Sequence, residues 1–282
     1  MGITKTSDLD GLVPLIYKEA RMTATEVPVM QNIVTKYDIR GQAGYQLIIP
    51  KWGTVVAEDL SEGVDLTNAQ TLGTTKLTFT VGKAGAQTIV TDEDVEDANE
   101  DVMKKHGRIL GEAIATKDDT DALSLFSALS GGYGSAGTTF TLGHFTAALT
   151  GLRANKAKGQ FYCVLHPYVY HVLANAVLAN SNYGTLLPAG SEIGTKFRAS
   201  EFLGVEIYED ANITIDAGVD SYGAMFTKEC FGRIEKRPLR IEKERDASLG
   251  AWELNATTRY VYGEVEDSFG KYLLFDSAAP TA

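Results

Sequence analysis

Two stretches in the first third of the chain follow the pattern of strands. Between residues 76 and 83, Leu77, Phe79 and Val81 alternate with polar side chains, which is the period of a half-buried strand. Residues 46–56 are also rich in strand-forming side chains, and a proline inside this stretch favours the edge of a sheet. The two stretches predict an antiparallel pair of residues 46–56 with residues 76–83.

The connection between these strands, residues 57–74, is long, polar and acidic. A two-stranded arm with so little beside it is marginally stable in water unless it packs on a partner. We therefore expect its apolar side chains to contact a neighbouring subunit. The candidate contact residues on this arm are Trp52, Leu77, Phe79 and Val81.

The next segment has the pattern of one long helix. Thr91 or Asp92 can cap its start, and no proline occurs between Pro50 and Pro167 to interrupt it. We expect the helix to continue to about Leu129, so that about 38 residues would span roughly 57 Å. This exceeds what a compact domain of this size requires and is typical of a component of an assembly.

Acidic side chains are concentrated at both ends of this helix. Near its start, Asp94, Glu96 and Asp97 are candidates for contacts with other subunits. Near its end, Asp118 and Asp119 lie close to further carboxylates, and we interpret them as a solvated or interface-facing surface. An apolar stripe that includes Ile109 is expected to face the core.

The remaining chain predicts a mixture of helices and strands. A glycine-rich stretch, residues 131–137, reads as a flexible break before a second lobe. Helices are expected at residues 144–156 and 168–178, and strands at 161–165, 202–208 and 223–226. The last fifty residues have only strand patterns. At the other end of the chain, residues 1–40 read as an arm. It has a short amphipathic helix near residues 9–20, followed by an extended segment over 25–31. The fold class is α+β.

The charge of the chain disfavours tight binding of nucleic acid. The net charge is −11, whereas sequence-independent binding needs a basic surface that releases counterions. One segment, residues 233–245, is rich in basic residues, among them Arg237 and Arg240, and also holds three glutamates. It reads either as a strand that pairs with the acidic helix or a neighbouring subunit, or as a patch facing packaged nucleic acid; the glutamates favour pairing.

Recognisable catalytic chemistry is missing from the sequence. Residues 132–137 match the dinucleotide fingerprint letter by letter, but they follow a helix where that motif must follow a strand. The four histidines do not form a metal-ligand motif, and Cys163 and Cys230 do not suggest a disulfide framework. We therefore expect no catalytic, cofactor or metal site. The alternative from another class is a soluble α+β enzyme with an unrecognised site.

Taken in order, these segments resemble the major capsid proteins of tailed bacteriophages, the shell proteins with the Hong Kong 97-type fold. The acidic helix start at residues 91–98, the strand, His-Pro and helix at 161–170, and the strand at 202–212 resemble parts of that family. The resemblance implies an N-terminal arm (1–40), an extended β-hairpin loop (41–88), a peripheral domain with a spine helix (89–130 and 231–282) and an axial domain (131–230).

The resemblance implies a function by association and not by catalysis. The chain would self-assemble as pentamers and hexamers into an icosahedral virion shell around double-stranded DNA, without sequence-specific DNA binding and away from membranes. It would be made in the host cytoplasm and would meet a portal and, depending on the system, scaffolding or decoration proteins. Some members of the family cross-link a loop lysine to an asparagine, but no motif identifies such a pair here, and we expect none. A related alternative is the shell subunit of a bacterial nanocompartment.

Overall fold

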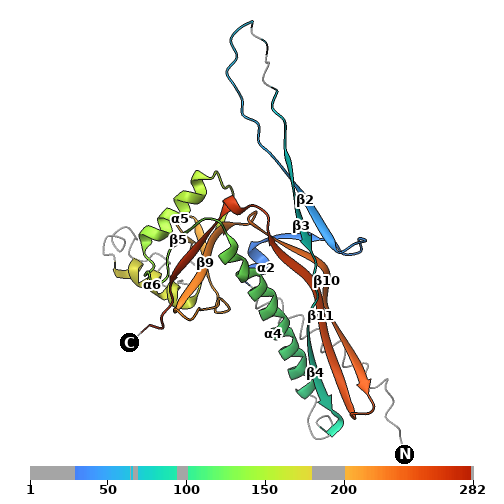
Figure 1. Ribbon diagram of the computed structural model, residues 1–282. Coiled ribbons are helices and arrows are strands. Elements are labelled where there is room, and N and C mark those ends of the chain that lie inside the picture. The colour runs from blue at the N-terminus through green and yellow to red at the C-terminus, as the bar shows by residue number, and fades with distance from the viewer. Residues whose placement is uncertain (1–28, 64, 66–68, 94–100, 180–200, 281–282) are drawn as a thin grey trace, which may run out of the picture.

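The computed structural model describes residues 29–63, 65, 69–93, 101–179 and 201–280. Two sheets lie side by side, and a two-stranded hairpin projects far beyond both of them (Figure 1). The predicted α+β fold is confirmed. The helix expected near residues 9–20 lies outside the described residues, as do Asp94, Glu96 and Asp97.

The first sheet has four strands in the order β1-β10-β11-β4. Its centre is the long antiparallel pair β10 (Phe231–Asp246) and β11 (Ala251–Glu264). Strand β1 (Thr35–Asp38) runs parallel to β10, and β4 (Ala84–Thr91) runs antiparallel to β11. The expected extended loop therefore includes residues that pair in this sheet, because 84–88 belong to β4.

Helix α4 (Asp101–Leu123) packs along this sheet (Figure 1). Leu110 and Ile114 meet Val90, Leu254 and neighbouring apolar residues of the sheet. The expectation of a single α-helix up to Leu129 is wrong at its end, because a 3₁₀ helix, η2 (Ser124–Ala128), replaces the last turns. The expected apolar stripe is also wrong at Ile109, whose side chain is 53% exposed.

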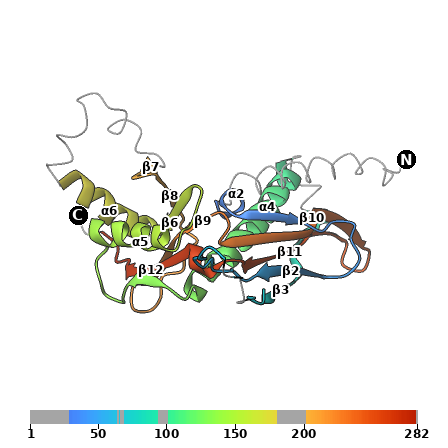
Figure 2. The same ribbon diagram turned by 90° about the horizontal axis from the view of Figure 1, so that it is seen from above.

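The second sheet has six strands in the order β5-β12-β9-β6-β8-β7. Helices α5 (Leu142–Ala154) and α6 (Pro167–Ala179) lie together beside this sheet (Figure 2), and their apolar side chains share its core. The strands are β5 (Gly132–Gly134), β6 (Phe161–Leu165), β7 (Glu201–Phe202), β8 (Val205–Glu209), β9 (Asp220–Thr227) and β12 (Gly270–Asp276). The two predicted helices are confirmed within two residues at each end, and the strand at 161–165 is confirmed. The strand predicted at 223–226 is also present, but β9 begins three residues earlier.

Glycine explains two departures from the sequence-based predictions. The expected flexible break contains β5, which pairs in parallel with β12, and a side chain at Gly132 would overlap the ring of Tyr272. The expected single strand at 202–208 is two strands joined at Leu203 and Gly204, which have φ values of 55° and 81°. Positive φ at both positions is typical of a tight hairpin turn.

A shared apolar cluster joins the two sheets. Phe126 of η2 lies between Phe226 of β9 and Phe231 at the start of β10, with ring centroids 5.8 and 5.9 Å from its own. Helix α2 (Met30–Ile33) supplies two more fully buried side chains to this cluster. Met30 and Gln31 are therefore helical, which corrects the extended conformation expected for residues 25–31.

Candidate intersubunit surfaces

The hairpin of β2 (Gln46–Trp52) and β3 (Thr74–Thr80) carries a row of exposed apolar side chains. Beyond the strands the two sides of the hairpin loop stay close, because Gly53 N–H donates to the Gly73 carbonyl (2.8 Å) and Gln70 forms two hydrogen bonds with the Val56 backbone. The exposed side chains on this projection are Ile48, Trp52, Val55, Val56, Leu60 and Leu72, with 43–70% of their surface open. Within the described subunit this surface has no core to cover it.

The base of the hairpin is fixed to the sheets. The Phe79 ring lies against Gly263 of β11, and Lys51 Nζ lies 2.6 Å from a Glu266 carboxylate oxygen. Val81 N–H donates to the Tyr45 carbonyl (2.9 Å). The hairpin therefore leaves the body in a defined direction (Figure 1).

The four expected contact residues of the hairpin differ in exposure. Trp52 is 62% exposed, and Leu77 is half-buried. Phe79 is half-buried and packs with Val81, which is only 4% exposed, in a cluster that includes Ile39 and Ile234 of the same subunit. The expectation that Val81 contacts a neighbour is therefore wrong, because its side chain belongs to the subunit's own core.

Asp118 of α4 is the centre of a buried polar network. It is 2% exposed and accepts hydrogen bonds from the Arg233 guanidinium of β10, the Tyr262 hydroxyl of β11 and the Gln31 amide. Burial raises the pKa of Asp118, and the charge of Arg233 opposes this shift. Arg233 also pairs with Glu235 at 2.5 Å, so the guanidinium joins two carboxylates.

Asp119 is fully buried on the same helix. The surface-exposed interpretation of Asp118 and Asp119 is therefore wrong. A sequence signal for Asp118 existed, because it continues the buried series Leu110, Ile114 and Ala122 at four-residue spacing.

The basic strand pairs mainly within the subunit. Arg233 meets Asp118 and Arg245 meets Asp92, which confirms ion pairing with the acidic segment. Arg240 pairs with Glu242 of its own strand at 2.5 Å, and both side chains are more than half exposed. Arg237 donates to the Thr257 hydroxyl at 2.9 Å. Their expected intersubunit roles stay predictions.

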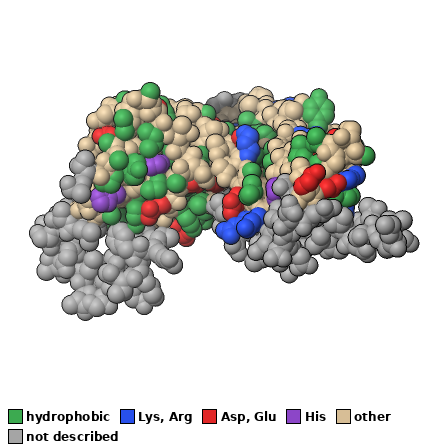
Figure 3. All heavy atoms as spheres, turned by 90° about the horizontal axis from the view of Figure 1, so that it is seen from below, with side chains coloured by type: hydrophobic (Ala, Val, Ile, Leu, Met, Phe, Trp, Pro, Cys, Tyr) green, Lys and Arg blue, Asp and Glu red, His purple; other side chains and the backbone are tan. Residues whose placement is uncertain are grey.

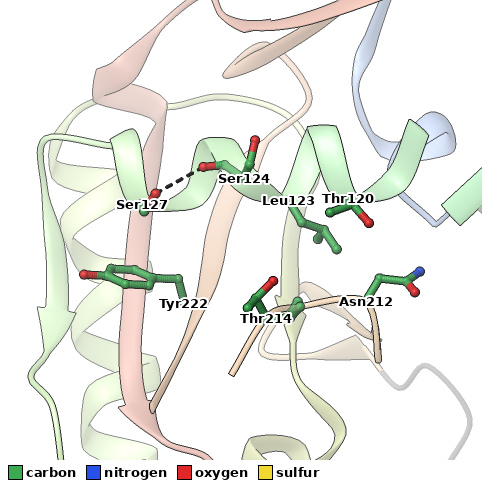
Figure 4. A pocket seen from close by; sticks show the side chains of 8 residues that line it. Thr120, Leu123, Ser124, Ser127, Asn212, Thr214 and Tyr222 are labelled. Carbon is green, nitrogen blue, oxygen red and sulfur yellow. Dashed lines mark hydrogen bonds between the residues drawn. The ribbon is translucent and has the colours of Figure 1, made fainter. Parts of the chain in front are cut away.

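A shallow groove of about 130 Å³ lies where α4 and η2 face the loop after β8. Its walls carry Leu123 and Thr120 on one side and Asn212 and Thr214 on the other (Figure 4). Tyr222 of β9 closes one end. The lining is small, and its hydroxyls come from scattered serines and threonines, so it lacks convergent groups for catalysis.

The described residues also hold no candidate metal site. No group of three or more His, Cys, Asp or Glu side chains there is arranged to hold a metal ion. Both cysteines are buried and unpaired. Within the same residues, no helix is both long and apolar enough to cross a bilayer. Seen from below, apolar side chains gather near the α5 and α6 end and basic ones near the middle (Figure 3).

Comparison with family models gives one match over most of the chain. A model described as phage capsid protein matches residues 74–270. The chain belongs to this phage capsid protein family. A search of curated proteins found no match.

Solved capsid structures share the fold of this phage capsid protein. The capsid of cyanophage P-SCSP1u is similar with a TM-score of 0.69 and 16% identity, covering 89% of each chain. A structure of Mycobacterium phage Che8 is similar with a TM-score of 0.70 and 14% identity, covering 89% of this chain and 91% of the other. The capsid of a native GTA particle is similar with a TM-score of 0.67 and 13% identity, covering 90% of each chain. The Hong Kong 97-type shell fold expected for this capsid protein is confirmed.

The nanocompartment alternative is less well supported. A virus-like particle from Pyrococcus furiosus is similar with a TM-score of 0.58 and 9% identity, covering 92% of this chain and 97% of the other. This likeness is weaker than that to the phage capsids. The family match assigns the capsid protein to the phage shell of a virion, where it forms homo-oligomers.

Proposed function

We propose that this capsid protein closes an icosahedral shell of pentamers and hexamers by laying its hairpin over a neighbouring subunit. The observation that carries the proposal is the exposed apolar row on β2, β3 and the connected loop, which includes Ile48, Trp52 and Val56. A surface of this kind on a long projection loses stabilisation in water and gains it when a partner covers it. The rigid base at Phe79 and Lys51 sets its direction.

The proposed roles of the segments follow from the resemblance to the family. Residues 1–40 form an arm, 41–88 contribute the extended loop with β4 joining the sheet, 89–130 and 231–282 form a peripheral domain, and 131–230 form an axial domain. The exposed ion pair of Arg240 with Glu242 can exchange partners with a neighbour at little cost, because such pairs are weak in water. Asp94, Glu96, Asp97 and Arg237 are proposed members of the same intersubunit charge contacts.

The shell encloses double-stranded DNA without gripping it. A net charge of −11 repels a polyanion, so the DNA is retained by closure and not by adhesion. A portal closes one vertex, and scaffolding or decoration proteins are further partners of the proposed assembly, which forms in the host cytoplasm. The protein acts as a structural component and not as an enzyme.

Deletion of residues 57–74 tests the role of the hairpin. We expect the deletion variant to fold and to remain as free subunits or capsomers, because the base of the hairpin stays anchored while the covering loop is lost. Light scattering and negative-stain microscopy measure this outcome. A control is replacement of 57–74 by a glycine-serine segment of equal length. Normal shells from both variants would refute the proposed role.

A further inference from the structure

Asp210 lies at the end of β8, in the loop that faces α4. It is 4% exposed, its backbone N–H donates to the Leu165 carbonyl (3.0 Å), and its Oδ1 atom accepts from the Asn212 backbone N–H (2.8 Å). Its other oxygen, Oδ2, is buried and has no hydrogen-bond donor among the described residues. Buried polar atoms are normally satisfied, so this atom requires an explanation.

The neighbouring group that reaches Asp210 is a second carboxyl group. Asp119 of α4 is fully buried and lies in hydrogen-bond range of the Asp210 side chain. Asp119 accepts from the Met30 backbone N–H and from the Asn212 side-chain amide, both at 3.1 Å. Two ionised carboxylates in contact and out of water repel each other, whereas a shared proton turns the same contact into a strong hydrogen bond.

We propose that Asp119 and Asp210 share one proton, and that this proton clamps the loop after β8 onto α4. The proton sits on Asp210 Oδ2, which then donates to the Asp119 carboxylate, so the orphaned atom becomes satisfied. The clamp joins the six-stranded sheet, through β8, to the helix that packs on the four-stranded sheet. Met30 and Asn212 hold Asp119 in position from the other side.

Among the described residues, no Lys or Arg side chain pairs with Asp119 or Asp210. The Arg233 guanidinium pairs instead with the adjacent Asp118 and with Glu235. Burial, together with the hydrogen bond and charge of Asp119, raises the pKa of Asp210 to about 7. The other titratable groups on the elements packed around the pair are Asp118 and Asp121 of α4, Glu206, Tyr208 and Glu209 of β8, His166 and Tyr170 near α6, and Tyr260 and Tyr262 of β11.

The proton can exchange with solvent through the groove at the end of α4. Asn212 lines this groove (Figure 4). Its side-chain amide also donates to Asp119, so Asp119 lies directly behind a residue of the groove wall. The carboxyl of Asp210 has its raised pKa only while the clamp is folded. Stability from the clamp is therefore fully present below the unfolded value of 3.8 and is lost as pH rises through about 7.

For a shell subunit, the clamp makes the junction between the sheets tighter in mild acid and looser in mild base. This consequence rests on the proposed shell function, whereas the clamp itself is a property of the folded subunit. The two are tested separately, because the experiment uses unassembled subunits. Absence of shells would overturn the proposed function and leave the clamp result intact.

Hydrogen exchange at pH 6 and pH 8 tests the clamp, with rates corrected for the intrinsic effect of pH. We expect protection of residues 205–214 in the wild type to fall by about tenfold between these values, since the protonated fraction of a group with a pKa near 7 falls by about that factor. Asp210→Asn keeps a donor toward Asp119 without titrating, so its protection should not change. Asp59→Asn removes an exposed loop carboxylate as the matched control and should behave as the wild type.

Infrared difference spectroscopy of the wild type tests the shared proton independently, even if Asp210→Asn does not fold. The wild type should show a protonated carboxylic acid at pH 6 that disappears by pH 8.5, and Asp59→Asn should retain it. Equal pH dependence of protection in the wild type and Asp210→Asn would overturn the proposal. So would the absence of a protonated acid in the wild type at pH 6.

Discussion

The Phe79 ring lies directly over Gly263, so that any side chain at position 263 would overlap it. Phe79 comes from the hairpin and Gly263 from β11 of the four-stranded sheet. This close approach, together with the ion pair of Lys51 and Glu266, connects the projecting hairpin to the body. A contact of this kind fixes direction because neither partner can be enlarged without displacing the other.

Gly263→Ala should therefore loosen the base of the hairpin. The added methyl group displaces the Phe79 ring, and overpacking of this kind costs about 1–3 kcal/mol of unfolding free energy. Chemical denaturation of the free subunit measures the loss. Gly73→Ala is the matched control in the same hairpin, because an added Cβ there meets nothing within 4 Å. Equal stability of the two variants would contradict the packing argument.

Arg233→Met should destabilise the subunit strongly. Removal of the guanidinium leaves Asp118 buried without its cation, and loss of one partner of a buried ion pair costs about 3–5 kcal/mol. Arg240→Met serves as the control, since its pair with Glu242 is exposed and such pairs contribute about 1 kcal/mol or less. Denaturant midpoints of both variants check the prediction. A small effect of Arg233→Met would show that the network around Asp118 is not needed.

Trp52→Ser should separate folding from assembly. The indole is 62% exposed in the subunit, so its removal should change the melting temperature of the free subunit little. The same change should reduce shell yield, because an aromatic anchor of the proposed contact is lost. Trp52→Phe should restore most of the yield. Particle counting by light scattering measures it, and an undiminished yield from Trp52→Ser would argue against the contact.

His166 gives a second dependence of stability on pH, opposite in sign to that of Asp210. His166 lies just before α6, and its Nδ1 atom accepts from the N–H of Tyr168 in the first turn (3.2 Å), which requires the neutral ring. Burial lowers the pKa of His166, so the unfolded chain binds more protons than the folded one below the ordinary value of 6.5. Stability from this contact is present above pH 6.5 and lost as pH falls.

His166→Asn should abolish that loss. An asparagine oxygen can cap the same N–H without titrating, and Pro167 remains at the first helical position. Thermal melts of variant and wild type between pH 5 and pH 8 should diverge toward the acid end. His171→Asn, at an exposed position on α6, should leave the curve unchanged. Parallel curves for His166→Asn and the wild type would contradict the assignment.

Regular patterns in the sequence identified much of the fold. The strand patterns of the last fifty residues are confirmed by β10, β11 and β12, and the helix predicted at 168–178 is confirmed as α6. These elements bury one face in the usual way, so local pattern and tertiary structure agree. Strand β4 was missed because its apolar positions include alanine and glycine, whose contribution depends on pairing with β11.

The sequence-based predictions are wrong where a polar or small side chain occupies a buried position that the pattern assigns to an apolar side chain. Asp118 is satisfied by Arg233 and Tyr262, and Asp119 by Asn212 and the Met30 backbone N–H. These partners are distant in sequence. Trp52 is exposed, and its contact with a neighbour stays a prediction. The burial of Val81 depends on Ile39, just after β1, and Ile234 of β10. Contacts between distant segments therefore decide which candidates remain available to neighbours.

Electron cryomicroscopy of particles assembled from this protein tests the central claim most directly. The account predicts closed shells in which residues 46–80 of each subunit lie over an adjacent subunit, with Trp52 covered by that neighbour. A protein that stays a free subunit with its portal and scaffolding partners present, or shells in which the hairpin contacts no neighbour, would contradict it.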